Sequence, residues 1–132
     1  MADDRFTRGW KRVGEINGQG AQAIQDALKD IAPDFAKYLV EFAFGDLYSR
    51  PGLSLKEREI ATIAALTAMG HTLPQLKAHI EGGLNVGITR EEIVEIIMQM
   101  AIYAGIPAVL NALGVAGEVF AAHTPASPPP QD

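Results

Sequence analysis

The sequence predicts an all-α protein, and three observations favour this class. No segment shows the sustained alternation of apolar and polar residues with β-branched enrichment that is typical of strands. Three segments match the capping-box pattern, in which a hydroxyl accepts from the third helical N–H while a glutamate or glutamine reaches back; they span residues 54–57, 72–75 and 89–92. Three glycines stand where left-handed caps would end helices: Gly70, Gly87 and Gly105.

The first third of the chain predicts two helices. Phe6, Trp10 and Val13 have helical spacing, and the glycines of residues 14–20 then break the pattern. A second helix is expected over residues 21–31.

The next segment begins at Pro33, which ends one helix or starts another because proline lacks the amide donor. Residues 34–48 then predict an amphipathic helix. Its apolar side chains fall broadly on one side: Phe35, Leu39, Phe42 and Leu47.

The capping boxes and glycines predict the helices of the second half of the chain. Their expected ranges are 55–69, 73–86, 89–104 and 107–120. The first two of these make a central antiparallel hairpin. We expect one helical domain over residues 1–123, because 132 residues fit a single ordinary domain. Residues 124–132 are proline-rich and have no apolar surface to bury, which predicts an extended tail.

Composition excludes several classes of function. The chain has no cysteine, which removes thiolate metal sites and thiol redox chemistry. The formal charge of −5 disfavours a nucleic-acid partner. No lysine or arginine follows Arg90, so the last third lacks a basic membrane-binding face. We therefore expect a cytoplasmic protein without a membrane or nucleic-acid partner. No nucleotide-binding or zinc motif occurs in the sequence, and neither metal nor cofactor is expected.

Two of the predicted helices are apolar on almost every side. Residues 60–69 have only threonine as polar content, and residues 93–104 have two polar members, Glu95 and Gln99. A helix with so narrow a polar stripe must be covered on most sides. Short helices of one small domain hardly supply that cover, so we expect a homo-oligomer.

His79 is the first candidate for chemistry. It shares one face of the 73–86 helix with Leu76, Ile80 and Gly83. A histidine on an apolar face can act as general acid or base near neutral pH. The alternative is a hydrogen-bonded core histidine.

Glu59 is the second candidate, because it lies near the start of an apolar helix. In an antiparallel hairpin His79 would lie level with about residue 64 or 65, which leaves Glu59 roughly 7 Å further along the axis. A bridging water is then more plausible than a direct contact. The alternative is a first-turn glutamate stabilised by the helix dipole.

Five further polar residues lie near apolar segments. Arg50 and Arg58 can each bind a carboxylate through two parallel hydrogen bonds. Tyr103 could donate to an enolate-like oxygen, and Asn85 and Asn111 complete the set. The corresponding structural roles are interface salt bridges, a core tyrosine and a cap asparagine.

Four blocks of sequence resemble the carboxymuconolactone decarboxylase family, over about Arg8 to Phe120. RGWKRVGEINGQG is similar to the opening block of the family, and residues 43–54, AFGDLYSRPGLS, to its AWGxxWxRPGL block. The segment from His79 to Leu113 is close to the long block of the family that begins with a histidine. Residues 116–120 match the closing helix.

The resemblance implies an alkylhydroperoxidase D-like fold and a ring-shaped homohexamer. It also implies cofactor-free loss of CO2 from γ-carboxymuconolactone, in the β-ketoadipate route of aromatic breakdown, or from a related lactone acid. His79 would donate the proton, Glu59 would orient or recharge it, and Arg50 or Arg58 would anchor a carboxylate. The peroxidase branch of the superfamily needs a CxxC pair, which is absent here. The alternative is a non-catalytic small-molecule-binding or assembly subunit on the same scaffold.

Overall fold

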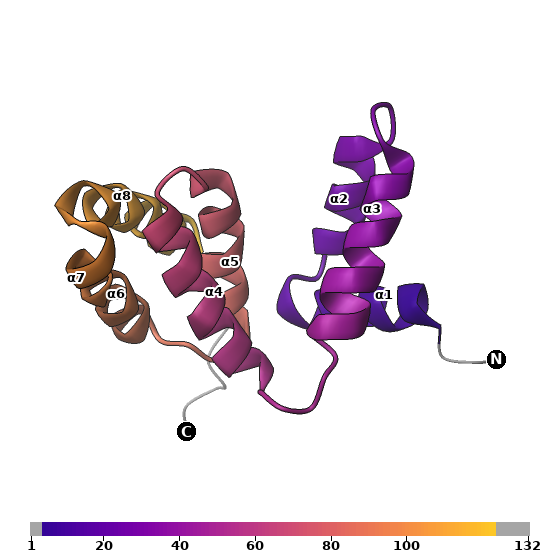
Figure 1. Ribbon diagram of the computed structural model, residues 1–132, viewed down its shortest axis with the longest axis horizontal. Helices are drawn as coiled ribbons and strands as arrows, with labels where there is room; N and C mark the ends of the chain where they lie inside the picture. Colours follow the sequence, from indigo (N-terminus) through magenta and orange to yellow (C-terminus); the bar gives the residue numbers. More distant parts are fainter. Residues whose placement is uncertain (1–3, 124–132) are drawn as a thin grey trace, which may run out of the picture. The chain divides into compact units, whose positions relative to one another are not determined.

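Helices account for all the regular secondary structure of residues 4–123, which are the part of the chain that the computed structural model describes (Figure 1). The predicted all-α class is therefore confirmed. The expected proline-rich tail, residues 124–132, lies outside the described residues. The elements are α1 (Arg5–Ile16), α2 (Gly20–Leu28), α3 (Pro33–Leu39), the π-helix η1 (Val40–Leu47), α4 (Leu55–Met69), α5 (Leu73–Asn85), α6 (Arg90–Gln99), α7 (Ala101–Ala104) and α8 (Ile106–Ala122). No helix of residues 4–123 combines the length and apolar character needed to cross a membrane.

The predicted helix boundaries agree best where caps mark them. α4 matches the predicted range, and α5 ends one residue early. The predicted helix over 89–104 is two helices, α6 and α7, with Met100 between them. α2 ends at Leu28 rather than at residue 31, and α1 runs through Gly14 to Ile16.

Two of the three predicted capping boxes form. Ser54 Oγ accepts from the Glu57 amide at 3.1 Å, and the Ser54 amide donates to Glu57 Oε1 at 2.8 Å. These hydrogen bonds from Ser54, that of its backbone amide above all, lower the pKa of the Glu57 carboxyl. Thr89 and Glu92 make the same reciprocal pair. The prediction of the third capping box, at residues 72–75, was wrong. The Thr72 hydroxyl instead donates to the Leu66 carbonyl at 3.0 Å, which stabilises the turn between α4 and α5.

The three glycines predicted as helix-ending caps all have positive φ. Gly70, Gly87 and Gly105 have φ of +80°, +103° and +92°. This backbone region is accessible to glycine at little cost, and no other described residue has positive φ. The prediction at these positions is confirmed.

The helix predicted over residues 34–48 forms, but it differs in two respects from a regular amphipathic helix packed on a core. The helix continues as η1 in the π-form, in which the Tyr48 amide donates to the Ala43 carbonyl at 2.8 Å. The bulky side chains of its expected apolar face are exposed; Phe35, Phe42 and Leu47 are 57%, 58% and 44% accessible. Its buried positions are small instead: Ala36, Val40 and Gly45.

The close packing of α1 on η1 explains this inversion. A Cβ atom on Gly9 would overlap the Val40 carbonyl oxygen, and one on Gly45 would overlap the Arg5 carbonyl oxygen. The two backbones therefore meet directly, and only small residues fit between them. Bulky side chains of η1 must point elsewhere.

The chain divides into two compact units, and the prediction of a single domain stays a prediction. Unit 1 contains the described residues up to Ala61 together with Gly82–Ile88, and unit 2 contains Thr62–Glu81 and the described residues from Thr89 onward. The core of unit 1 includes Val13, Ile16, Ala21, Ala36, Val40 and Ile88.

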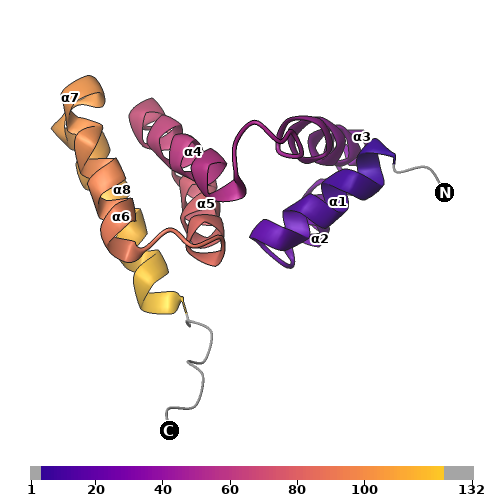
Figure 2. The same ribbon diagram turned by 90° about the horizontal axis from the view of Figure 1, so that it is seen from below.

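Unit 2 contains most of the predicted helix hairpin. Within it, the part of α4 from Thr62 onward and the part of α5 up to Glu81 are joined by the short turn at Gly70–Thr72 (Figures 1 and 2). α6 packs against α8, and α7 connects them. Its core includes Ile63, Leu76, Ile80, Ile93, Ile97, Val109, Ala112, Ala116 and Val119.

The contact between α1 and η1 predicts opposite effects for two glycine substitutions. Gly45→Ala should destabilise the protein by about 1–3 kcal/mol, because its methyl group meets rigid backbone. Gly14→Ala, also in a helix but with open space around its Cβ, should stabilise it by about 0.5–1 kcal/mol. Urea unfolding of the three proteins measures both changes. Equal stability of the Gly45→Ala variant and the parent would contradict the packing described here.

Candidate functional site

Six site candidates singled out from the sequence are shared between the two units. Unit 1 contains Arg50, Arg58, Glu59 and Asn85, whereas unit 2 contains His79 and Tyr103.

Glu59 is completely buried, with no accessible surface. It lies on α4, and its carboxylate faces Gly82, where an added Cβ would lie 3.7 Å from Oε2 and 2.6 Å from Ile16 Cγ2. The absence of a side chain at Gly82 therefore makes room for both the carboxylate and Ile16. Glu57, not Glu59, is the acidic residue in the first turn of α4, so Glu59 is not the first-turn glutamate of the alternative interpretation. Burying a carboxylate is costly, so a buried glutamate is a candidate for a functional role.

Arg58 is held in place by two contacts within unit 1. Its Nη2 donates to the Arg50 carbonyl at 2.9 Å, and its guanidinium carbon lies 6.0 Å from the centre of the Tyr48 ring. This distance suits a cation–π contact. Arg58 therefore fixes the backbone of the turn that carries Arg50.

Arg50 differs from Arg58 in the contacts of its guanidinium group. Its side chain is exposed, and within residues 4–123 its guanidinium makes no hydrogen bond or ion pair. Its position is set by the Arg50 amide, which donates to the Leu47 carbonyl at 3.2 Å, and by the bond from Arg58 to its own carbonyl. Arg50 thus has more N–H donors available for an anionic ligand than Arg58 has.

Asn85 has a defined structural role. Its side-chain amide donates to the Ile16 carbonyl at 2.9 Å, across 69 positions of sequence. Ile16 is the last residue of α1, where carbonyls lack helical partners. Asn85 therefore ties the end of α5 to the end of α1, and this use of its amide was not predicted.

The two candidates in unit 2 differ in burial. His79 is half-buried on α5. Tyr103, on the short helix α7, is 74% exposed, so the alternative of a core tyrosine is wrong. Within residues 4–123, its hydroxyl has no hydrogen-bond partner.

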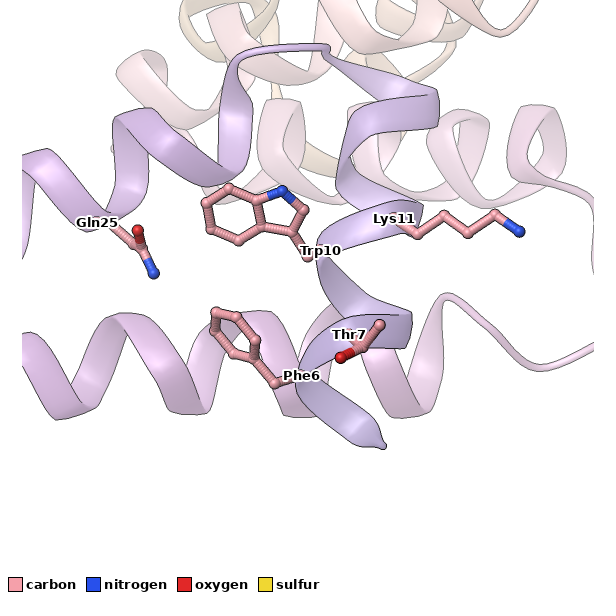
Figure 3. A pocket seen from close by; sticks show the side chains of 5 residues that line it. All are labelled: Phe6, Thr7, Trp10, Lys11 and Gln25. Carbon is pink, nitrogen blue, oxygen red and sulfur yellow. The ribbon is translucent and has the colours of Figure 1, made fainter. Parts of the chain in front are cut away.

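The sequence interpretation did not single out an apolar hollow on α1, here called the aromatic hollow. It is lined by Phe6, Thr7, Trp10, Lys11 and Gln25 and has a volume of about 470 Å³. The Phe6 and Trp10 rings are tilted, with centres 5.7 Å apart, and Figure 3 shows both extending toward Gln25. Their spacing of four residues was the available signal, but the same spacing also suits a buried helix face.

No three His, Asp or Glu side chains gather into a potential metal site anywhere in the described part of the chain. The six site candidates singled out from the sequence supply one imidazole, one carboxyl, two guanidinium groups, one amide and one phenol.

Comparison with known proteins identifies the family. The model of the carboxymuconolactone decarboxylase family matches residues 33–118, which is more than half of the chain. The protein belongs to this family. Its helical architecture agrees with the alkylhydroperoxidase D-like fold that the sequence resemblance implied. The match begins at α3, so α1 and α2 lie outside it.

Three relatives match much of the chain. The 4-carboxymuconolactone decarboxylase of Acinetobacter baylyi is 34% identical over 119 residues, which cover 89% of this chain and 88% of the relative. An uncharacterized 15.0 kDa protein of Paracoccus denitrificans is 36% identical over 72% of each chain. The nitrosuccinic acid decarboxylase of Metarhizium robertsii is 30% identical over 71% of this chain and 67% of its own.

The Asn85 contact predicts a loss of stability on truncation. Asn85→Ala should lower the free energy of unfolding by roughly 0.5–1.5 kcal/mol, because the Ile16 carbonyl loses its partner. Asn111→Ala, at an exposed position on α8, is the control and should leave stability unchanged or slightly higher. Chemical denaturation measures both. If Asn85→Ala is as stable as the parent, the bond to Ile16 contributes nothing and a ligand-binding role for Asn85 regains weight.

Proposed function

We propose that this protein is a decarboxylase that acts in the cytoplasm on γ-carboxymuconolactone, or on a related lactone acid, without a cofactor. The observation that carries the proposal is its similarity to the Acinetobacter baylyi 4-carboxymuconolactone decarboxylase, which extends over nearly the full length of both chains. On this proposal the protein acts in the β-ketoadipate route of aromatic breakdown.

The chemistry of such substrates supports a reaction that the side chains of this protein can assist. When the bond to the carboxylate breaks, CO2 leaves and the electron pair enters the conjugated lactone, giving a dienolate. A proton delivered to carbon then completes the product. The name of the Metarhizium relative points to an acid with a nitro group, which can accept an electron pair in the same way. The shared requirement is stabilisation of a developing anion and delivery of one proton.

His79 is our proposed proton donor and Glu59 its positioning residue. Imidazole titrates near neutral pH and can therefore both release and regain a proton during turnover. His79 is half-buried on α5, where it precedes Gly82 by one helical turn. Glu59 presents a buried carboxylate to Gly82. We propose Glu59 for this role because its carboxylate is buried and the family resemblance implies it. Glu59 would orient or reprotonate the imidazole, directly or through water.

Arg50 is the better proposed anchor for the substrate carboxylate. Its exposed guanidinium keeps its donors available, whereas that of Arg58 donates to the Arg50 carbonyl and lies over Tyr48. A free guanidinium can bind a carboxylate through two parallel hydrogen bonds. Arg58 then acts by holding the turn that carries Arg50. Tyr103 remains a proposed donor to the substrate, because its hydroxyl has no hydrogen-bond partner within residues 4–123.

Substitution of His79 tests the proposed mechanism. The purified protein should release CO2 from γ-carboxymuconolactone, and His79→Ala should lower kcat by about 10²–10⁴-fold, the usual loss for a general acid. His71→Ala is the matched control, because His71 is exposed on a turn and its Nδ1 lies 2.9 Å from the Met69 carbonyl. That variant should keep the parent rate.

The arginines should affect a different kinetic constant. Arg50→Ala should mainly raise KM, because it removes an interaction made equally in ground and transition states. If His79→Ala folds and turns over at the parent rate, His79 is not the donor. If the parent protein releases no CO2 from any lactone acid, the alternative of a non-catalytic binding or assembly subunit is favoured.

We also propose that the protein is a homo-oligomer, and the family resemblance suggests a hexamer. Unit 2 exposes four large apolar side chains within nine residues: Ile102 (77%), Tyr103 (74%), Ile106 (62%) and Leu110 (63%). We call this set the α7–α8 apolar face. Exposed apolar surface of this extent is typical of an interface, and the face carries no lysine or arginine.

A charge placed in the α7–α8 apolar face should disrupt the assembly. Light scattering should give a mass several times that of the monomer for the parent and a smaller mass for Leu110→Asp, because a charge cannot be buried there without a partner. Glu118→Lys, at an exposed position on the same helix, is the control and should keep the parent mass. A parent protein that is monomeric at micromolar concentration would contradict the proposal.

A further inference from the structure

Positive charge is concentrated on α1 in a chain that is acidic overall. This helix carries four of the eleven lysine and arginine residues of a protein with a formal charge of −5: Arg5, Arg8, Lys11 and Arg12. Arg5 is engaged by Asp46, with Nη2 and Oδ2 2.7 Å apart. The hydrogen bond from Arg5 lowers the pKa of the Asp46 carboxyl and keeps this pair charged. The other three cations line one hollow, and of these Arg8 is also paired with Asp46, with Nη2 and Oδ1 3.6 Å apart.

This second hollow, here called the basic hollow, has a volume of about 280 Å³. It is lined by Thr7, Arg8, Lys11, Arg12, Glu15 and Ser49, all of which belong to unit 1. Three cations and two hydroxyl groups therefore surround the hollow, against a single carboxylate. Such a volume suits a small anion rather than a large ligand.

The guanidinium of Arg12 is fixed in the basic hollow from two sides. Its Nη1 donates to Glu15 Oε2 at 2.7 Å, and its Nε donates to Ser49 Oγ at 3.4 Å. The Ser49 hydroxyl in turn donates to the Phe44 carbonyl at 2.6 Å, which orients its oxygen as an acceptor for Arg12. A guanidinium has five N–H donors, so several remain for a ligand. The arginine is thus positioned before any ligand arrives.

Lys11 contributes a second available cation. Its side chain is exposed and, within residues 4–123, has no hydrogen bond or ion pair. Lys11 and Thr7 line both hollows of α1, but Figure 3 shows the Lys11 side chain extending away from the Trp10 ring. Its ammonium group therefore points away from the aromatic rings.

We propose that the basic hollow binds a small multivalent anion, that is, a di- or tricarboxylate or a phosphate group. Two or more negative charges match Lys11 and Arg12 together, whereas one charge satisfies only one of them. Arg8 adds a third cation at the same wall, and Thr7 can donate its hydroxyl proton. None of the residues proposed for decarboxylation lines this hollow, and binding there does not depend on that function.

Calorimetric titration at constant ionic strength tests the proposal. Tricarballylate and inorganic phosphate are titrated separately, and acetate serves as the monovalent comparison. Constant ionic strength matters because exposed charges are screened by salt. We expect saturable binding of tricarballylate or of phosphate, and the stronger of the two identifies the ligand chemistry. Trp10 is the single tryptophan of the chain and neighbours Lys11, so its fluorescence gives a second readout.

Three variants assign the binding to the basic hollow. Lys11→Gln should weaken binding roughly tenfold without disturbing the fold, since one charge-assisted contact is lost. Glu15→Gln should strengthen binding, because it removes the single carboxylate among the lining residues. Lys37→Gln, which removes the same charge from an exposed position on α3, is the matched control and should bind as the parent does.

Two results would overturn the proposal. One is the absence of saturable binding for both multivalent anions, or binding of acetate that equals them at the same ionic strength. The other is an equal loss of affinity in Lys11→Gln and Lys37→Gln. That result would mean that anion binding depends only on the net charge of the protein and not on the basic hollow.

Discussion

The backbones of α1 and η1 meet at Gly9 and Gly45 with no side chain between them, and the architecture of unit 1 depends on this contact. Such close approach leaves carbonyls of η1 within reach of arginine side chains on α1. Arg8 Nε donates to the Gly45 carbonyl at 2.7 Å, and the Arg5 guanidinium holds Asp46 one residue later. A buried or half-buried carbonyl without a hydrogen-bond partner destabilises the fold. These bonds therefore stabilise the packing of α1 on η1.

The same contact links the fold to the properties of the surface. Arg5 and Arg8, which hold η1, also place positive charge along α1, and Arg8 lines the basic hollow together with Lys11 and Arg12. Since only small residues fit against α1, the bulky side chains Phe35 and Phe42 are left exposed. A packing constraint between two helices thus determines both a charged surface and an apolar one.

A different constraint operates at Glu59. Gly82 makes room for the buried carboxylate, and Asn85, one turn later on α5, binds the end of α1 through the Ile16 carbonyl. The residues predicted from the sequence to bind substrate therefore have different roles in the structure. Asn85 stabilises the chain, Arg58 holds a turn, and Arg50 keeps its donors available.

The sequence by itself determined the helical class, the positions of α4, α5 and α8 to within about two residues, and the three glycines of positive φ. These features depend on local interactions: a capping hydroxyl acts three residues away, and a left-handed residue is forced by its own backbone. Tertiary structure alone decided the π-form of η1, the exposure of Phe35 and Phe42, and the bond from Asn85 to Ile16. The periodicity of residues 34–48 identified an apolar face but did not show what that face packs against. Which face of a helix is buried depends on how closely its neighbour approaches, and the approach of α1 to η1 is decided by Gly9 and Gly45, 36 positions apart in the chain.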